Sequence, residues 1–155
     1  MATAGCFAES KLYTGLAELP HFNPDDDTEP LPPAVVTLRA ELAAAEAVLI
    51  CTPEYAGGLP GSFKNLLDWT VGGGEVYGKP VAWINASSVA APTGGADAHD
   101  SLRKVLTYAG ARIVTKACIR LPVPRDVVNN GEVADPDLRA RIATAVQHLL
   151  EGARA

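Results

Sequence analysis

The sequence lacks the features that would tie the protein to a membrane or to a nucleic acid. No run approaches the ~18 apolar residues that a membrane-spanning helix needs. Its 13 Lys and Arg are outnumbered by 18 Asp and Glu, which gives a net charge of −5 and leaves no basic stripe for phosphates. The first ten residues lack the basic and apolar regions of a secretory signal. These absences favour a cytoplasmic protein with neither a membrane nor a nucleic acid as partner.

Cysteine and histidine are scarce and scattered. Cys6, Cys51 and Cys118 form an odd set without C-x-x-C spacing, so neither a disulfide framework nor a zinc site is expected. Cys51 and Cys118 lie in apolar runs, which predicts that both are buried as small apolar residues. The three histidines lie far apart, without the spacing of a metal site or a catalytic triad. We therefore expect no metal and no catalytic side chain.

The 155 residues suit one domain, 1–155, with a hydrophobic fraction of 48% that is typical of globular proteins. Acid and proline gather between Asn23 and Pro33, which predicts a loop. After this loop, helix-forming segments alternate with short apolar runs. The run 47–51 does not alternate, which predicts a strand buried on both faces. Helices are expected at 34–45, 61–71, 100–108 and 135–153, and strands at 47–51, at 80–86 and within 111–121.

This alternation is the order of an α/β fold with a parallel sheet. Ligands bind such sheets beyond the carboxyl ends of the strands. The segment TPEYAGG, 52–58, leaves the first apolar strand at that end. Pro53 stiffens the exit from the strand, and Gly57 and Gly58 allow the backbone to approach a ligand closely. Backbone N–H groups and the face of Tyr55 suit a flat aromatic ligand.

The same region resembles the signature of the NAD(P)H-dependent FMN reductase family, which includes quinone, chromate and azo-dye reductases. The matching pattern is P-E-Y-x-G-x-x-P-G-x-x-K-N-x-x-D-W. It is carried by Pro53, Glu54, Tyr55, Gly57, Pro60, Gly61, Lys64, Asn65, Asp68 and Trp69. Further along, 78–81, Ser87, Ser88 and 93–96 resemble the next strand and the flavin-facing loop of that family. Upstream, 12–24 resembles its second strand and the following loop.

The resemblance implies a flavodoxin-like three-layer α/β/α sandwich. It also implies hydride transfer from NAD(P)H to bound FMN, and from there to a flavin, quinone or similar small-molecule acceptor. Because the flavin carries this chemistry, no acid–base side chain is required. Cofactor contacts are expected from Pro53, Glu54, Tyr55, Ala56, Ser88, Gly94 and Gly95.

Self-association is a further expectation. The helix 61–71 carries more apolar side chains than one sheet-facing stripe can use. A homodimer or a higher homo-oligomer would bury the surplus, and the family resemblance points the same way.

The chain departs from the family at its start. The family opens with a strand and a Ser/Arg-bearing loop that binds the FMN phosphate at a helix N-terminus. Nothing similar precedes Leu12, so this strand and its phosphate-binding loop are expected to be missing, through a mis-assigned start or a true truncation. A strand near 11–14 would then lack its neighbour. Two alternative functions stay open: an FMN-binding electron carrier, and a truncated remnant that no longer binds flavin.

Overall fold

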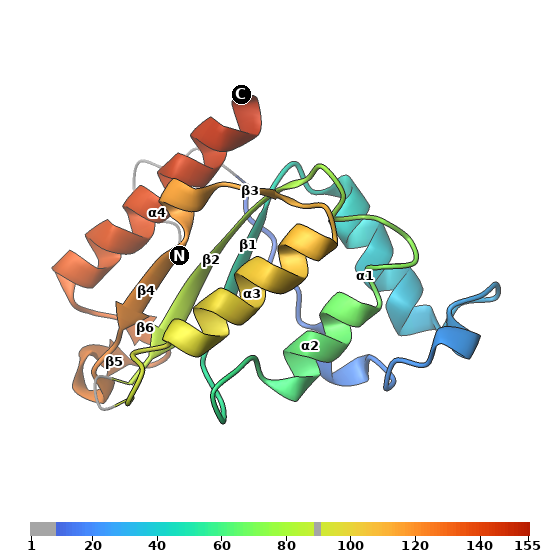
Figure 1. The fold of residues 1–155 in the computed structure, drawn as a ribbon. Coiled ribbons are helices and arrows are strands. Elements are labelled where there is room, and N and C mark those ends of the chain that lie inside the picture. The colour runs from blue at the N-terminus through green and yellow to red at the C-terminus, as the bar shows by residue number, and fades with distance from the viewer. Residues whose placement is uncertain (1–8, 89–90) are drawn as a thin grey trace.

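The computed structural model describes residues 9–88 and 91–155. In these residues the central strand of a parallel sheet, β2, pairs with β1 along one side (Figure 1). Along its other side it pairs with β3 near its start and with β4 near its end. A separate hairpin, β5–β6, turns at Asn130 and Gly131, both of which have positive φ. The strands are β1 (Val48–Thr52), β2 (Pro80–Ser87), β3 (Arg112–Ile113), β4 (Ile119–Pro122), β5 (Val128–Asn129) and β6 (Glu132–Val133).

Helices cover both faces of β2, because alternate side chains of a strand point to opposite faces. Trp83 packs in one cluster with Leu102 of α3, whereas Ala82 packs in another with Leu149 of α4. The three-layer α/β/α sandwich is thereby confirmed. The helices are α1 (Pro33–Ala44), α2 (Gly61–Asp68), α3 (Ala96–Tyr108) and α4 (Pro136–Arg154).

The closing helix follows the start signals in its sequence. The side chain of Asp135 caps α4 by accepting a hydrogen bond from the N–H of Leu138 at 2.9 Å. Pro136 occupies the first turn, where its missing N–H costs nothing. The expected helix 135–153 is confirmed within one residue at each end.

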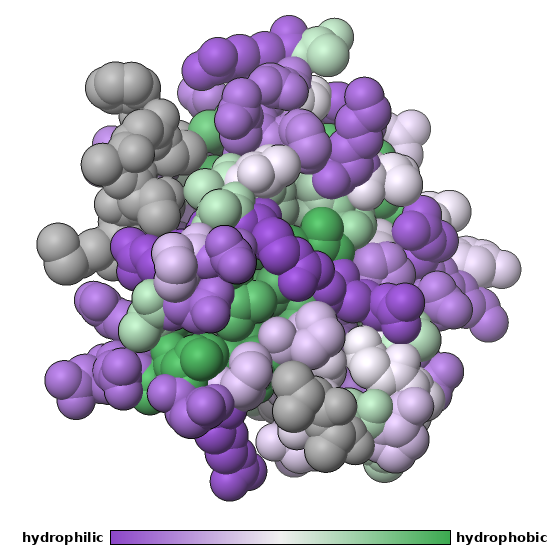
Figure 2. Space-filling model, turned by 90° about the vertical axis from the view of Figure 1, so that its left-hand side faces the viewer, coloured by the Kyte–Doolittle hydropathy of each residue, from purple (hydrophilic) through white to green (hydrophobic). Residues whose placement is uncertain are grey.

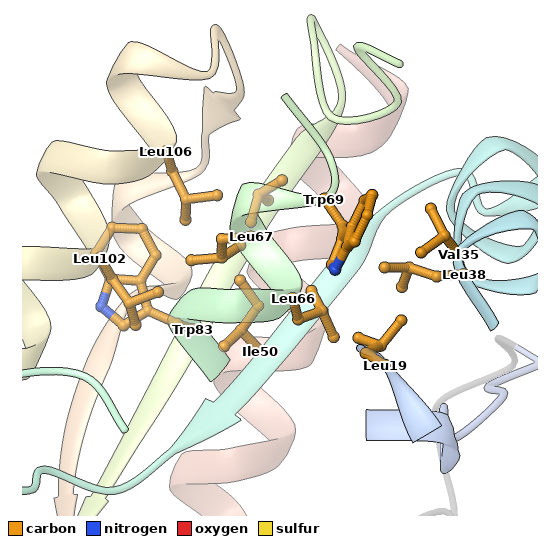
Figure 3. Packing of buried hydrophobic residues seen from close by; sticks show 11 residues of the cluster. Leu19, Val35, Leu38, Ile50, Leu66, Leu67, Trp69, Trp83, Leu102 and Leu106 are labelled. Carbon is orange, nitrogen blue, oxygen red and sulfur yellow. The ribbon is translucent and has the colours of Figure 1, made fainter. Parts of the chain in front are cut away.

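The apolar side chains of α2 are buried within the chain itself. Figure 3 shows Trp69, which follows α2, lying between Leu66 and the α1 residues Val35 and Leu38. The Trp69 indole N–H donates to the carbonyl oxygen of Pro20 at 2.9 Å. The segment around Pro20 and helix α1 therefore cover Trp69, so this part of the expected surplus is used within the chain. Val71 is 63% exposed, and the dimer stays a prediction.

No strand forms near 11–14. Residues 9–14 have no regular structure, and a 3-10 helix, Gly15–Glu18, follows them. Lys11 forms an ion pair with Glu41 of α1 at 2.8 Å, and Tyr13 packs against the core. The segment lies against a helix, where no strand edge is offered for pairing. The first eight residues, where the family's opening strand is expected to be missing, lie outside the described residues, as does Cys6.

Strand β1 is buried on one face only, which corrects the expectation for 47–51. Ile50 is 7% exposed, whereas Leu49 is 38% exposed and Cys51 is also exposed. The prediction that Cys51 is buried is therefore wrong, and Cys118 is half-buried. The reason is that α4 packs against β2 and the segment 115–117, so its cover does not extend across β1.

The last expected strand is divided in two. A 3-10 helix, Thr115–Ala117, separates β3 from β4 and places Ala117 against Ala82 and Leu149. Helix α2 also ends earlier than expected, at Asp68, where the Thr70 hydroxyl donates to the carbonyl oxygen of Leu67 at 2.7 Å. Continuous apolar patterns conceal such breaks, because buried turns and strands use the same residue types.

Candidate functional site

A cavity of ≈ 520 Å³ opens beyond the carboxyl ends of β1 and β2. This volume lies within the range of small-molecule sites. The position is also the one where parallel sheets bind their ligands. The lining residues are Pro53, Glu54, Tyr55, Ala56 and Gly57 after β1, and Ala86, Ser87, Ser88, Ala91, Pro92, Thr93 and Asp97 at the end of β2 and beyond it.

The first wall of the cavity is a tight turn. Tyr55 and Gly58 exchange two backbone hydrogen bonds, each 3.0 Å long, around Ala56 and Gly57. The φ angles of Ala56 and Gly57 are +49° and +73°, the signs of a type I′ turn. Within the described residues, the backbone N–H groups of Ala56 and Gly57 have no acceptor. The Tyr55 side chain, 66% exposed, stands beside these donors.

The second wall contains polar groups that are buried without partners. Ser87 lines the cavity, but its hydroxyl oxygen is buried, and neither this hydroxyl nor the fully buried Asn85 amide has a hydrogen-bond partner in the described chain. Both lie on the same face of β2 as Trp83, at alternate positions. Buried polar groups are rarely left unpaired in proteins. The Ser87 hydroxyl and the Asn85 amide therefore mark a buried polar spot behind the cavity wall.

Glu54 joins the two walls. One carboxylate oxygen, Oε1, accepts from the Thr93 hydroxyl at 2.5 Å. The other, Oε2, accepts from the backbone N–H groups of Asp97 and Ala98 at 3.0 and 3.1 Å. The hydrogen bond from Thr93, followed by that from Ala98, lowers the pKa of Glu54 below its ordinary value. These hydrogen bonds therefore favour the ionised form of the carboxylate.

The structure gathers most of the predicted site residues around this cavity. Pro53, Glu54, Tyr55, Ala56 and Ser88 line it. Gly94 and Gly95 follow Thr93 and do not line it. Sequence reasoning missed Ser87 and Asp97 as lining residues. The alternation that makes Ser87 continue the face of Trp83 is the signal that could have found it.

Two further observations concern the described residues, 9–88 and 91–155. None of their His, Cys, Asp and Glu side chains gather in groups of three or more that could hold a metal ion. None of their helices is both long enough and apolar enough to cross a membrane.

The fold is that of a flavodoxin-like α/β/α protein, with a cavity at the carboxyl edge of its sheet. The family model for NADPH-dependent FMN reductase matches residues 3–122. The chain belongs to the NADPH-dependent FMN reductase family, whose members are oxidoreductases that use NAD(P)H and FMN.

Individual relatives agree with this family. The chain is 30% identical over 137 residues to an NAD(P)H-dependent FMN reductase of Pseudomonas aeruginosa, covering 86% of this chain and 73% of that protein. It is 33% identical over 132 residues to a quinone reductase of Escherichia coli K12, covering 82% and 69%. Among solved structures, it is similar to the flavoenzyme NAD(P)H:(acceptor) oxidoreductase FerB from Paracoccus denitrificans. That similarity has a TM-score of 0.73 and 27% identity, and covers 88% of this chain and 78% of FerB.

Proposed function

We propose that this protein is an NAD(P)H-dependent reductase that binds the FMN ring in the cavity between its two loops and passes electrons to a flavin, quinone or similar acceptor. The observation that carries the proposal is the cavity itself. It lies at the carboxyl edge of the sheet and is lined by the family's P-E-Y segment on one side and by residues 86–88 and 91–93 on the other.

The groups around the cavity fit a flat heteroaromatic ring with carbonyl oxygens. The N–H groups of Ala56 and Gly57 are free to donate to such oxygens. The Tyr55 ring offers an aromatic face at the mouth of the cavity. Gly94 and Gly95 would not contact the ring. Their positive φ angles would instead shape the backbone that leads from the cavity lining into α3.

When bound, FMN supplies the hydride chemistry. The protein's own residues supply position and polarity. The turn 55–58 and the loop after β2 orient the ring and exclude water from its buried side. No acid–base side chain of this chain is assigned to the reaction.

A two-step assay tests the proposal against its alternatives. The purified protein is titrated with free FMN while flavin fluorescence is followed, and NADPH oxidation is then measured with menadione as acceptor. Binding together with oxidation supports the reductase. Binding without oxidation would favour the electron carrier, and no binding would favour the remnant.

We also propose a cytoplasmic location and self-association. The described cysteines, Cys51 and Cys118, are free thiols, as in a reducing compartment.

Apolar residues gather in the middle of the side where α4 and β4 lie (Figure 2). Ile119, Leu138 and Ile142 are partly buried residues of these elements and offer surface to a second copy. Sedimentation velocity of the wild type and of Ile142→Glu tests this, and a monomer in the wild type would overturn it.

A further inference from the structure

Helix α3 has no cap from its own sequence. It begins at Ala96, its N-cap residue is Gly95, and no side chain at that position accepts a hydrogen bond. The first N–H groups of a helix need outside acceptors, which an N-cap Ser, Thr, Asp or Asn ordinarily supplies. A side chain at Gly95 would overlap the amide of Asn85, and its φ of +82° also disfavours any other residue. The cap must therefore come from elsewhere in the chain.

Glu54 supplies it from the other wall of the cavity. Its Oε2 accepts from the N–H groups of Asp97 and Ala98, which are the second and third residues of α3. Those are the two positions that an N-cap side chain serves. A carboxylate at a helix N-terminus also gains from the helix dipole. The Thr93 hydroxyl holds the second oxygen, so both oxygens of Glu54 have partners within the chain.

We propose that Glu54 is a positioning residue: it is the remote N-cap of α3, and through this cap it fixes the turn 55–58 against Thr93 and Asp97 at the width that the flavin ring requires. Pro53 and Tyr55 are its sequence neighbours on one wall, and Thr93 and Asp97 lie on the other. Without the carboxylate, both the turn 55–58 and the start of α3 would become more mobile. The statement about the ring rests on the proposed function, whereas the cap and its hold on the turn do not.

Three variants separate the hydrogen bonds from the charge. Glu54→Ala removes every bond. Glu54→Gln can keep all three, because one amide oxygen can accept from both N–H groups while the NH₂ donates to the Thr93 hydroxyl. Thr93→Val removes one bond only. Glu46→Ala and Glu46→Gln are matched controls, because Glu46 is exposed and has no hydrogen bond or ion pair within the described chain.

The first readout uses the protein without flavin. Amide hydrogen exchange at Ala98 reports on the start of α3. Exchange at Gly58, whose N–H closes the turn, reports on the turn. We expect exchange at both amides to accelerate about tenfold in Glu54→Ala, which corresponds to a typical cap. In Glu54→Gln and in the Glu46 variants, exchange should stay within about threefold of wild type. Acceleration at Ala98 alone would overturn the hold on the turn, and no acceleration would overturn the cap.

The second readout is FMN affinity. Glu54→Ala should weaken binding about tenfold, Thr93→Val by less, and Glu54→Gln should restore affinity to within about threefold. If Glu54→Ala binds FMN as tightly as wild type, the proposal that Glu54 sets the cavity width for the flavin ring is overturned. If wild-type protein binds no FMN, the proposed function fails, and the exchange at Gly58 still decides whether Glu54 fixes the turn.

Discussion

Strands β1 and β2 are parallel neighbours, paired from Val48 with Val81 to Thr52 with Asn85, yet they are covered differently. In β2, three successive residues, Val81, Ala82 and Trp83, are all fully buried. In β1, Ile50 is buried while Leu49 and Cys51 are exposed. Two apolar runs of similar composition thus occupy unlike environments, because α4 packs on β2 and not across β1.

The unequal cover of β1 and β2 affects the stability of the fold but not the position of the cavity. Side chains of β2 that face either helix layer contribute to folding, whereas in β1 only the face toward α2 and α3 does so. The loops that leave both strands nevertheless form one cavity. A site at the carboxyl edge depends on where the strands end, and not on how many layers cover them.

The largest effect is expected at the doubly covered strand. Trp83→Ala should destabilise the protein by about 3–5 kcal/mol, because it empties a fully buried site and removes the hydrogen bond from the indole N–H to His99 Nδ1 at 2.9 Å. Urea unfolding followed by circular dichroism measures this. Trp83→Phe, which keeps most of the volume, should cost less. A loss below about 1 kcal/mol in Trp83→Ala would contradict the burial of Trp83 against α3.

The two faces of β1 should differ from each other. Ile50→Ala should cost about 2–4 kcal/mol, and Leu49→Ala less than about 1 kcal/mol, since Leu49 is already 38% exposed. The same urea experiment on the pair provides the comparison, with each variant the control for the other. Equal losses would mean that a layer covers both faces of β1.

The turn after β1 is strained at one residue. Ala56 has a φ of +49°, a conformation that costs L-residues energy and that Asn tolerates better. Ala56→Asn should stabilise the protein by about 0.5 kcal/mol. Gly57→Ala, at φ +73°, should instead destabilise it. Thermal unfolding of both variants shows the signs, and a stabilising Gly57→Ala would refute the type I′ geometry.

The smallest effect concerns the thiols. Cys51 on the uncovered face should react with a soluble thiol reagent faster than half-buried Cys118, and Cys51→Ser should change stability by less than about 0.5 kcal/mol. Partial burial raises the pKa of both thiols, so both rates should keep rising as pH increases beyond the ordinary thiol range. Mass spectrometry of single-cysteine variants assigns the rates. Faster labelling of Cys118 than of Cys51 would contradict the exposure of Cys51 on β1.

Local patterns predicted the elements better than their surroundings. The helices near 34–45 and 135–153 form where helix formers, Pro136 and the Asp135 cap indicated them. Residues 53–56, which the signature singled out, line the cavity, and their contact with a flavin stays a prediction. Thr93, 39 residues from Glu54, could not be paired with it from the sequence, because nothing local records a contact across a crossover connection.

The amino-acid sequence by itself determined the α/β alternation, the family and the loop that carries the P-E-Y segment, because periodicity, turn residues and a dense motif are local properties. The tertiary structure alone decided that β1 has an open face, that Trp69 is buried under the segment around Pro20, and that Glu54 caps a helix in the opposite wall. Each of these depends on which elements pack together. Packing joins residues far apart in the chain, so no local pattern contains it.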